Sequence, residues 1–199
     1  MDKILIDLPE TIQTQRLILQ IPKAGFGRKL HAAINDGYED YIKWLHWSKA
    51  IPTAERLEQE CREHHAKFIL RELIRYLIID KQSLEVLGAT AFPIPQLIWQ
   101  VPQFGISYFI RKSARAKGYA TEAAHAMTLL AFRNLNAKKL EIHCEDDNTA
   151  SKKIPSALGY KLEYNRRGGF PRADGMLANL QTYSIFSESD LIYDGKVEW

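Results

Sequence analysis

Only two of the 199 residues are cysteines, Cys61 and Cys144, which excludes a disulfide scaffold and a four-thiolate zinc module. The sequence lacks any apolar run near the roughly 20 residues needed to span a bilayer. Residues 1–10 lack the apolar core of a signal peptide. A net charge of only +3 gives little general attraction to nucleic acid. We therefore expect a cytoplasmic protein with neither a membrane nor a nucleic acid as its partner.

The remaining composition is that of a globular protein, with 46% hydrophobic and 26% charged residues. At about 150 residues per domain, the length predicts a single domain over 1–199, long enough to bury a sizeable core. Hydrophobic periodicity and turn signals place strands and helices alternately along the chain. We expect strands over 14–21, 76–80, 85–92, 104–110, 139–144, 160–164 and 178–186, and helices over 27–35, 38–47, 54 to about 72, 120–135 and 148–158. Thr53 is the expected N-cap of the third helix, a Gly- and Arg-rich loop joins the last two strands, and a polar tail covers 187–199. This order is typical of a mixed α/β domain.

Two groups of residues resemble functional motifs but lack parts of them. The segment Gly25–Gly27 is without the third glycine of a dinucleotide fingerprint, and we interpret it as a structural turn. Cys61, His64 and His65 have no further ligand at zinc spacing, so a solvated helix face is favoured over a metal site.

His143, Cys144 and Glu145 place a base, a nucleophile and an acid side by side on an expected strand. Adjacent residues of a strand point to opposite faces, so His143 cannot activate Cys144 directly. We interpret Cys144 as a small buried hydrophobic residue, on the same face as Leu140 and Ile142.

The segment Arg111–Ala120 joins an expected strand to an expected helix, and four of its first eight residues are basic. The start of a helix offers unpaired N–H groups and the positive end of the helix dipole. Gly118 allows a ligand to approach the backbone closely. Charge, glycine and helix start coincide here and predict an anion site suited to a pyrophosphate, against the alternative of a solvated basic loop.

The segment Arg115–Ala120 matches the Gln/Arg-x-x-Gly-x-Gly/Ala motif for acetyl-coenzyme A, and with it the sequence resembles the GNAT superfamily of N-acetyltransferases. Further motifs are similar to the RimJ/RimL-type branch, which acetylates the N-termini of ribosomal proteins. They are Thr14–Leu19 (Thr-x-Arg-Leu-x-Leu), Tyr119–Ala123, Asn148–Ser151 (Asn-x-x-Ser), Leu158–Tyr160, and the aromatic segment with Trp44 and Trp47 ahead of Thr53. The resemblance covers about 12–186.

The resemblance implies an α/β (α+β) fold with a twisted mixed sheet and helices on both faces. Two parallel central strands, 104–110 and 139–144, would splay apart and hold the pantetheine of acetyl-CoA, with no metal. The implied cofactor-binding residues are Phe109, Ile110, Arg115, Ala116, Lys117, Gly118, Tyr119, Ala120, Asn148 and Ser151. Ser151 and Asn148 would also be catalytic, with Ser151 donating to the departing sulfur.

The implied acceptor is a primary amine, on a small molecule or at a peptide N-terminus. The protein itself is expected to be a monomer or a homodimer. Trp44, Trp47 and Tyr108 would line the acceptor site, with Tyr38 or Tyr41 nearby, although an aromatic stripe at helical spacing is more commonly core packing.

Two positions depart from the family pattern. Pro155 stands where many members have a tyrosine acid, and Gly105 stands where a strand carboxylate is usual. The missing carboxylate favours an alternative hypothesis, an acyl-CoA sensor with little turnover. A third hypothesis, nucleic-acid binding through the basic stretches 111–117, 152–153 and 166–167, is less favoured because no aromatic residues interleave with them.

Overall fold

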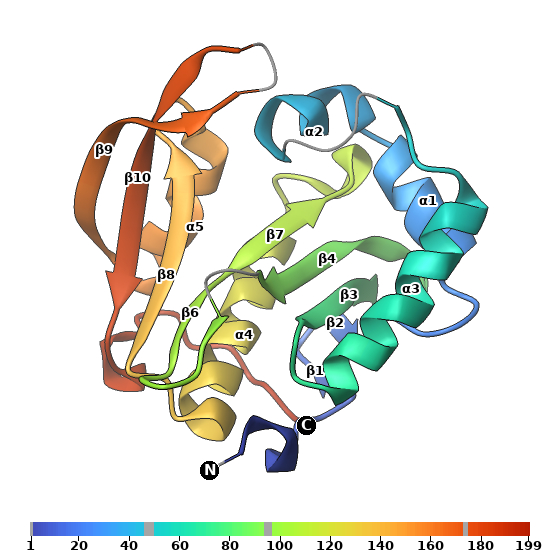
Figure 1. Ribbon diagram of the computed structural model, residues 1–199, viewed down its shortest axis with the longest axis horizontal. Coiled ribbons are helices and arrows are strands. Elements are labelled where there is room, and N and C mark those ends of the chain that lie inside the picture. Colours follow the sequence, from blue (N-terminus) through green and yellow to red (C-terminus); the bar gives the residue numbers. More distant parts are fainter. Residues whose placement is uncertain (1, 46–49, 94–96, 173–174) are drawn as a thin grey trace.

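The computed structural model describes residues 2–45, 50–93, 97–172 and 175–199. Its helices are α1 (Gly27–Asn35), α2 (Tyr38–Leu45), α3 (Ala54–Ile69), α4 (Tyr119–Leu135) and α5 (Thr149–Leu158), with short 3₁₀ turns η1 (Lys3–Leu5), η2 (Lys112–Ala114) and η3 (Glu188–Asp190). Its strands are β1 (Thr11–Gln13), β2 (Leu17–Gln20), β3 (Ile74–Asp80), β4 (Val86–Phe92), β5 (Leu97–Ile98), β6 (Gln103–Gly105), β7 (Ser107–Ile110), β8 (Lys139–Glu145), β9 (Lys161–Pro171) and β10 (Leu177–Ile185). Figure 1 shows their arrangement.

The strands of the described residues form two five-stranded sheets. The first has the order β1-β2-β3-β4-β7 and the second the order β5-β6-β8-β10-β9. The segment 103–110 belongs to both. As β6 it pairs in parallel with β8 up to Gly105 opposite Glu141, and the N–H of Ile106 donates to Glu141 O at 2.8 Å. As β7 it then turns away and pairs with β4. The predicted single strand is therefore two strands, and the predicted splay between two central parallel strands is confirmed.

Helices cover both faces of the first sheet, as predicted (Figure 1). One core contains residues of α4 such as Met127 and Leu130 packed with Tyr76 and Ile78 of β3. The other contains α1 and α3 residues packed with Leu77 and Ile79, which alternate with the first pair along the same strand. Because α4 is buried nearly all round and rich in alanine, it can lie close beneath both sheets.

Local signals placed several helix ends correctly. Helix α1 spans the predicted range, and Thr53 caps α3 by accepting the N–H of Arg56 at 3.1 Å. Asn148 and Gly159 bound α5, with Gly159 in the left-handed conformation at φ +98°. These helix ends are determined by capping side chains and by glycine, and both can be recognised from the sequence.

Three predicted boundaries were wrong. The predicted strand 14–21 is shorter, as β2, and is preceded by β1. Helix α3 ends at Ile69 rather than near Glu72, because Arg71 adopts φ +55° and donates to backbone carbonyls of its own turn and of Ile6. The Gly- and Arg-rich segment expected to be a loop is the second half of β9, an exposed edge strand with register shifts against β10. This half of β9 is held by hydrogen bonds to β10. Its own residues show no apolar alternation, so no strand is predicted there from the sequence.

The segment after β10 packs on the domain although it is polar. Glu198 forms an antiparallel bridge with Gln13, and the N–H of Ile192 donates to Leu158 O at 3.2 Å. The ring of Tyr193 lies 4.9 Å from that of His125 on α4. Within the described residues, no helix combines the length and apolar character needed to cross a membrane.

Candidate active site

The start of α4 presents a run of unpaired backbone N–H groups. The first intrahelical bond there is donated by Glu122 to Gly118 O at 3.0 Å, and the described residues provide no acceptor for the six N–H groups of residues 116–121. Ala116 and Gly118 both have positive φ, +59° and +81°, which turns successive N–H groups toward one side. No side chain caps the helix at Gly118. The start of α4 therefore has the unpaired backbone N–H groups that the predicted anion site requires.

Two of the four basic side chains of this loop form ion pairs with acidic residues. Arg111 and the Ser113 hydroxyl both bind the Asp36 carboxylate, which holds the pKa of Asp36 at about 2. Arg115 binds Asp40 at 2.6 Å and lies over the ring of Tyr41. These two arginines connect the loop to the α1–α2 turn, so their charges are neutralised by acidic residues some 75 positions away in the chain. Lys112 and Lys117 are exposed and have no ion pair with the residues described.

We expect Arg115→Ala to act on stability more than on cofactor affinity. The substitution removes the bond to Asp40, a second bond to Ile110 O at 3.1 Å and the contact with Tyr41. Since this ion pair is half exposed, the free energy of unfolding should fall by only about 1 kcal/mol. Thermal unfolding and calorimetric titration with acetyl-CoA test this result. A large loss of affinity at unchanged stability would instead show that the guanidinium contacts the ligand.

A buried carboxylate, Glu122, holds the loop before α4 in place through Thr14 and Arg16. Glu122, in the first turn of α4, accepts the Thr14 hydroxyl at 2.6 Å and the Arg16 N–H at 2.7 Å. Its other oxygen pairs with the Arg16 guanidinium at 2.7 Å, and Arg16 also donates to Lys117 O at 2.8 Å. The Thr-x-Arg pattern at the start of β2 therefore holds the loop in its conformation. This long-range role was not predicted from the sequence.

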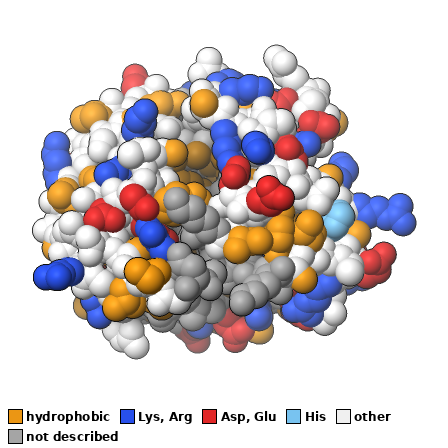
Figure 2. Space-filling model, turned by 90° about the horizontal axis from the view of Figure 1, so that it is seen from above, with side chains coloured by type: hydrophobic (Ala, Val, Ile, Leu, Met, Phe, Trp, Pro, Cys, Tyr) orange, Lys and Arg blue, Asp and Glu red, His pale blue; other side chains and the backbone are white. Residues whose placement is uncertain are grey.

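Beyond Ile106 the facing edges of β7 and β8 no longer pair with each other. Unpaired strand edges inside a protein are a place for an extended ligand to add hydrogen bonds. Figure 2 looks down on the upper end of the molecule in Figure 1 and shows a hollow there, with hydrophobic side chains inside it and Lys or Arg side chains near its edge. The Ile110 carbonyl already accepts bonds from Tyr41 at 2.8 Å and from Arg115.

Two hydroxyl groups meet across this opening. The Tyr108 hydroxyl lies 3.2 Å from Ser151 Oγ and 3.4 Å from the Ser151 carbonyl. Burial raises the pKa of Tyr108, so its hydroxyl keeps its proton. Asn148 uses its side-chain oxygen to cap α5 through the Ser151 N–H at 3.1 Å. Cys144 is buried beside them, and burial raises the pKa of its thiol to about 11. The structure thus joins Tyr108, predicted to bind the acceptor, to the predicted catalytic residue.

The predicted aromatic lining is only partly in place. Tyr38 and Tyr41 are buried, which favours core packing for them. Trp44 is half-buried, and the Arg172 guanidinium lies 5.9 Å from the centre of its ring. Trp47 lies outside the described residues.

The weaker motifs of the sequence have structural roles here. Glu58 accepts the N–H groups of Gly25 and Gly27 at 2.9–3.0 Å, which explains the Gly25–Gly27 turn. Cys61 is fully buried rather than on a solvated face, because α3 packs this side against β3. Burial lowers the pKa of His64 to about 4, and its Nδ1 lies 3.3 Å from Arg75. The described residues contain no cluster of three or more potential metal ligands.

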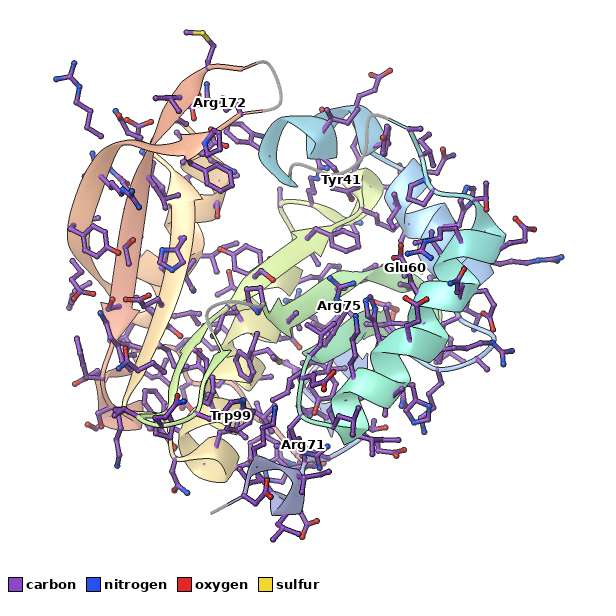
Figure 3. All side chains as sticks on the ribbon, viewed as in Figure 1. Tyr41, Glu60, Arg71, Arg75, Trp99 and Arg172 are labelled. Atoms are coloured by element: carbon purple, nitrogen blue, oxygen red, sulfur yellow. The ribbon has the colours of Figure 1, made fainter. Side chains whose placement is uncertain are left out.

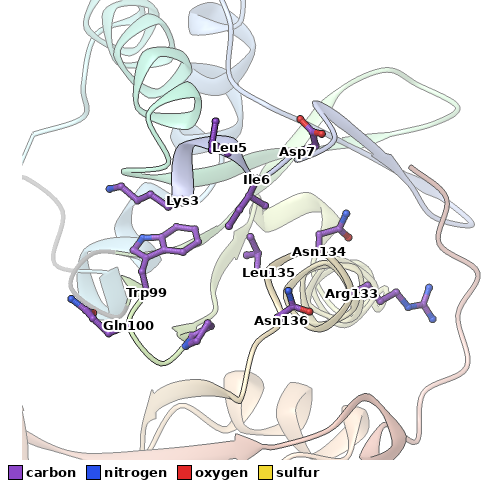
Figure 4. A pocket seen from close by; sticks show the side chains of 11 residues that line it. Lys3, Leu5, Ile6, Asp7, Trp99, Gln100, Arg133, Asn134, Leu135 and Asn136 are labelled. Atoms are coloured by element: carbon purple, nitrogen blue, oxygen red, sulfur yellow. The ribbon is translucent and has the colours of Figure 1, made fainter. Parts of the chain in front are cut away.

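A second pocket lies at the opposite end of α4 (Figure 4). It has a volume of about 620 Å³ and is lined by Ile6, Trp99 and Leu135 together with Asn134 and polar residues of the N-terminal turn. The anion loop and the Tyr108–Ser151 pair do not contribute to it.

On the other face of β8, His143 and Glu145 were considered in the sequence only as partners of Cys144, and their contacts with Glu141 and Arg172 were not predicted. His143 lies 2.9 Å from Thr182 Oγ1 and 3.2 Å from Glu141, whose pKa is lowered to about 2 by His143 and Lys139. Glu145 follows on the same face and binds Arg172. The signal was available in the sequence, because polar residues at 141, 143 and 145 alternate with the apolar face that was recognised.

The profile of the acetyltransferase (GNAT) domain family matches residues 28–161. The chain belongs to this family. Two curated relatives of this GNAT acetyltransferase carry the name uncharacterized N-acetyltransferase. YjdG of Bacillus subtilis (strain 168) is 29% identical over 163 residues, covering 77% of this chain and 90% of the relative. The p20 protein of Bacillus licheniformis is 28% identical over 111 residues, covering 56% of this chain and 61% of the relative.

Solved structures share the fold of this GNAT acetyltransferase at low identity. MccE, a microcin C7 self-immunity acetyltransferase in complex with acetyl-CoA and AMP, superposes with a TM-score of 0.78 at 18% identity, covering 87% of this chain and 93% of its own. RimL, a ribosomal L7/L12 α-N-protein acetyltransferase in complex with coenzyme A, gives 0.77 at 17%, covering 88% and 96%. The ribosomal-protein-S5-alanine acetyltransferase of Vibrio fischeri gives 0.77 at 14%, covering 92% and 98%.

Proposed function

We propose that this GNAT acetyltransferase moves an acetyl group from acetyl-CoA to a primary amine at the N-terminus of a peptide or protein. The observation that carries the proposal is the division of segment 103–110 between two sheets directly before a helix start with six unpaired N–H groups. An open strand edge suits the amides of pantetheine, and the N–H groups suit its pyrophosphate. The protein N-terminal acceptor is supported by the names of the RimL and S5-alanine structural neighbours.

In the proposed reaction the amine nitrogen attacks the carbonyl carbon of the thioester. A carbon–nitrogen bond forms and the carbon–sulfur bond breaks, while one proton leaves the nitrogen and one reaches the sulfur. The products are an N-acetyl amide and coenzyme A with a free thiol. The chain's part is to hold both reactants in register and to supply hydrogen-bond donors where negative charge develops.

Cofactor binding is assigned to the backbone of residues 116–120, to Phe109 on β7, and to Asn148 and Ser151 at the start of α5. Ile110 and Arg115 contribute through the shape of the loop rather than through direct contact, since their polar groups already have partners. Ser151, with Tyr108 behind it, is the donor to the sulfur. Pro155 cannot donate, and the hydroxyls of Ser151 and Tyr108 lie 3.2 Å apart between α5 and β7.

Incubation with acetyl-CoA and a panel of amines tests the proposal. Release of coenzyme A should depend on the added amine and be fastest with short peptides whose N-terminus is free. Mass spectrometry should place the acetyl group on the terminal nitrogen, and peptides already blocked there should be inert. Tight binding of acetyl-CoA without turnover on any amine would favour the acyl-CoA sensor suggested by Gly105.

A further inference from the structure

Glu145 is a buried carboxylate with one unsatisfied oxygen. Only 4% of the residue is exposed, and Oε2 accepts Arg172 Nε at 2.5 Å. Oε1 is buried and has no hydrogen-bond partner among the described residues. Leaving a buried polar atom without a partner costs about 1–3 kcal/mol, and more for a charged group. A native protein retains such a group where something else completes it.

Strand geometry places Glu145 at the end of β8, on the face turned away from Ser151 and α5. It shares a face of β8 with Glu141 and His143, whereas Cys144 faces the opposite way, toward Ser151 and α5. The Arg172 guanidinium that binds Glu145 also lies over the ring of Trp44 on α2. The pair therefore lies between the end of β8 and α2, near Arg172 in Figure 3 and across the opening from Tyr41.

The charges around this carboxylate favour a cation. The Arg172 guanidinium binds two carboxylates. Its Nε donates to Glu145, and its Nη2 donates to Asp147 at 2.6 Å. One guanidinium thus serves two carboxylates and leaves one negative charge without a positive partner in this group. The half-buried Trp44 ring adds a surface that attracts cations.

We propose that Oε1 of Glu145 receives the acceptor's ammonium group and thereby selects cationic primary amines. The inference rests on the proposed function and assigns the recognition of its acceptor. Arg172 fixes one oxygen of the carboxylate, so the other is oriented before the acceptor arrives. Glu145 is a binding and specificity-determining residue. The bound ammonium loses one proton to water, and the neutral amine that results then attacks the thioester as in the proposed reaction.

The test compares Glu145→Gln with Asp147→Asn, using a short peptide amide with an N-terminal serine as acceptor. Each substitution removes one carboxylate from Arg172, but only Glu145 has a buried free oxygen. We expect Glu145→Gln to raise KM for the peptide about 10- to 100-fold, as for loss of a hydrogen bond to a charged group. Asp147→Asn should leave KM within about threefold, because its carboxylate is exposed and its pair is weak. Equal effects of the two variants would overturn the proposal and reduce Glu145 to a support for Arg172.

A binding measurement on the wild-type protein keeps the proposal testable if Glu145→Gln does not fold. In competition for the acceptor site, the same peptide without its terminal amine should bind at least about 10-fold more weakly than the peptide with its ammonium group. Equal competition would overturn the assignment. Acetyl-CoA affinity separates the two levels of inference. If the wild-type protein neither binds acetyl-CoA nor acetylates the peptide, the proposed function fails, whereas normal acetylation with an unchanged KM in Glu145→Gln contradicts only this inference.

Discussion

Replacing Gly118 with valine should reduce acetyl-CoA affinity about 100-fold or more while the protein remains folded. Gly118 has φ +81°, a conformation that costs a residue with a Cβ about 1–2 kcal/mol and a β-branched residue more. The added Cβ would lie 3.4 Å from Arg16 Nη2, and Nη1 of the same guanidinium donates to the Lys117 carbonyl. Relief of this strain moves the N–H groups that the loop presents. Calorimetric titration with acetyl-CoA measures the loss.

Gly25→Val is the matched control for this substitution. Gly25 also has positive φ, +93°, and nothing lies within 4 Å of an added Cβ. It lies in the turn before α1 and takes no part in the anion loop. Both variants carry a similar backbone strain, so a comparable loss of thermal stability with a selective loss of affinity in Gly118→Val identifies the loop. Unchanged affinity in a folded Gly118→Val protein would contradict the cofactor assignment.

Removing the Ser151 hydroxyl should lower kcat by about 10- to 1000-fold with little change in acetyl-CoA affinity. The hydroxyl donates to charge that develops on the sulfur, so its contribution is made in the transition state. Tyr108→Phe removes the group that lies 3.2 Å from Ser151 Oγ and should show a smaller loss of the same kind. Steady-state kinetics and calorimetry on both single variants and the double variant measure these effects.

Coupling between the two hydroxyls is the decisive readout. If Tyr108 acts by orienting Ser151, the double variant should lose little more than Ser151→Ala alone. Because burial raises the pKa of Tyr108, its ionisation should not shape the rate between neutral and mildly alkaline pH. A wild-type kcat in Ser151→Ala would leave the serine only its place in the first turn of α5.

The sequence predicted those features whose physical cause is local. Helix α1, the cap at Thr53 and the glycine end at Gly159 were correct because turn and cap residues determine them within a few positions. The unpaired N–H groups before α4 were predicted for the same reason, from a glycine at a helix start.

Features that depend on distant partners were not predicted. Nothing between residues 104 and 110 marks Ile106 as the point of division, because its cause is the end of pairing with β8. From the sequence alone, Arg115 would be expected to have a free charge for binding an anion. In the structure its charge is paired with Asp40, which lies on α2. Glu145 and Arg172 meet only because β9 continues through a segment that looks like a loop. The roles of Gly118, Asn148 and Ser151 toward acetyl-CoA stay predictions.

If acetyl-CoA binds along the divided segment 103–110 as proposed, it would also complete the pairing between the two sheets. The two sheets share this chain segment, and their facing strands are hydrogen-bonded up to Ile106 and unpaired with each other beyond it. A chain-like ligand with its own amides would act there as the missing strand and close the wedge. A ligand that binds only the folded state stabilises it by RT ln(1 + [L]/Kd), where [L] is the free ligand concentration. This amounts to about 2.7 kcal/mol when [L] is a hundred times Kd. Coenzyme A carries the same pantetheine and pyrophosphate, so the product would stabilise the fold by the same contacts as the donor.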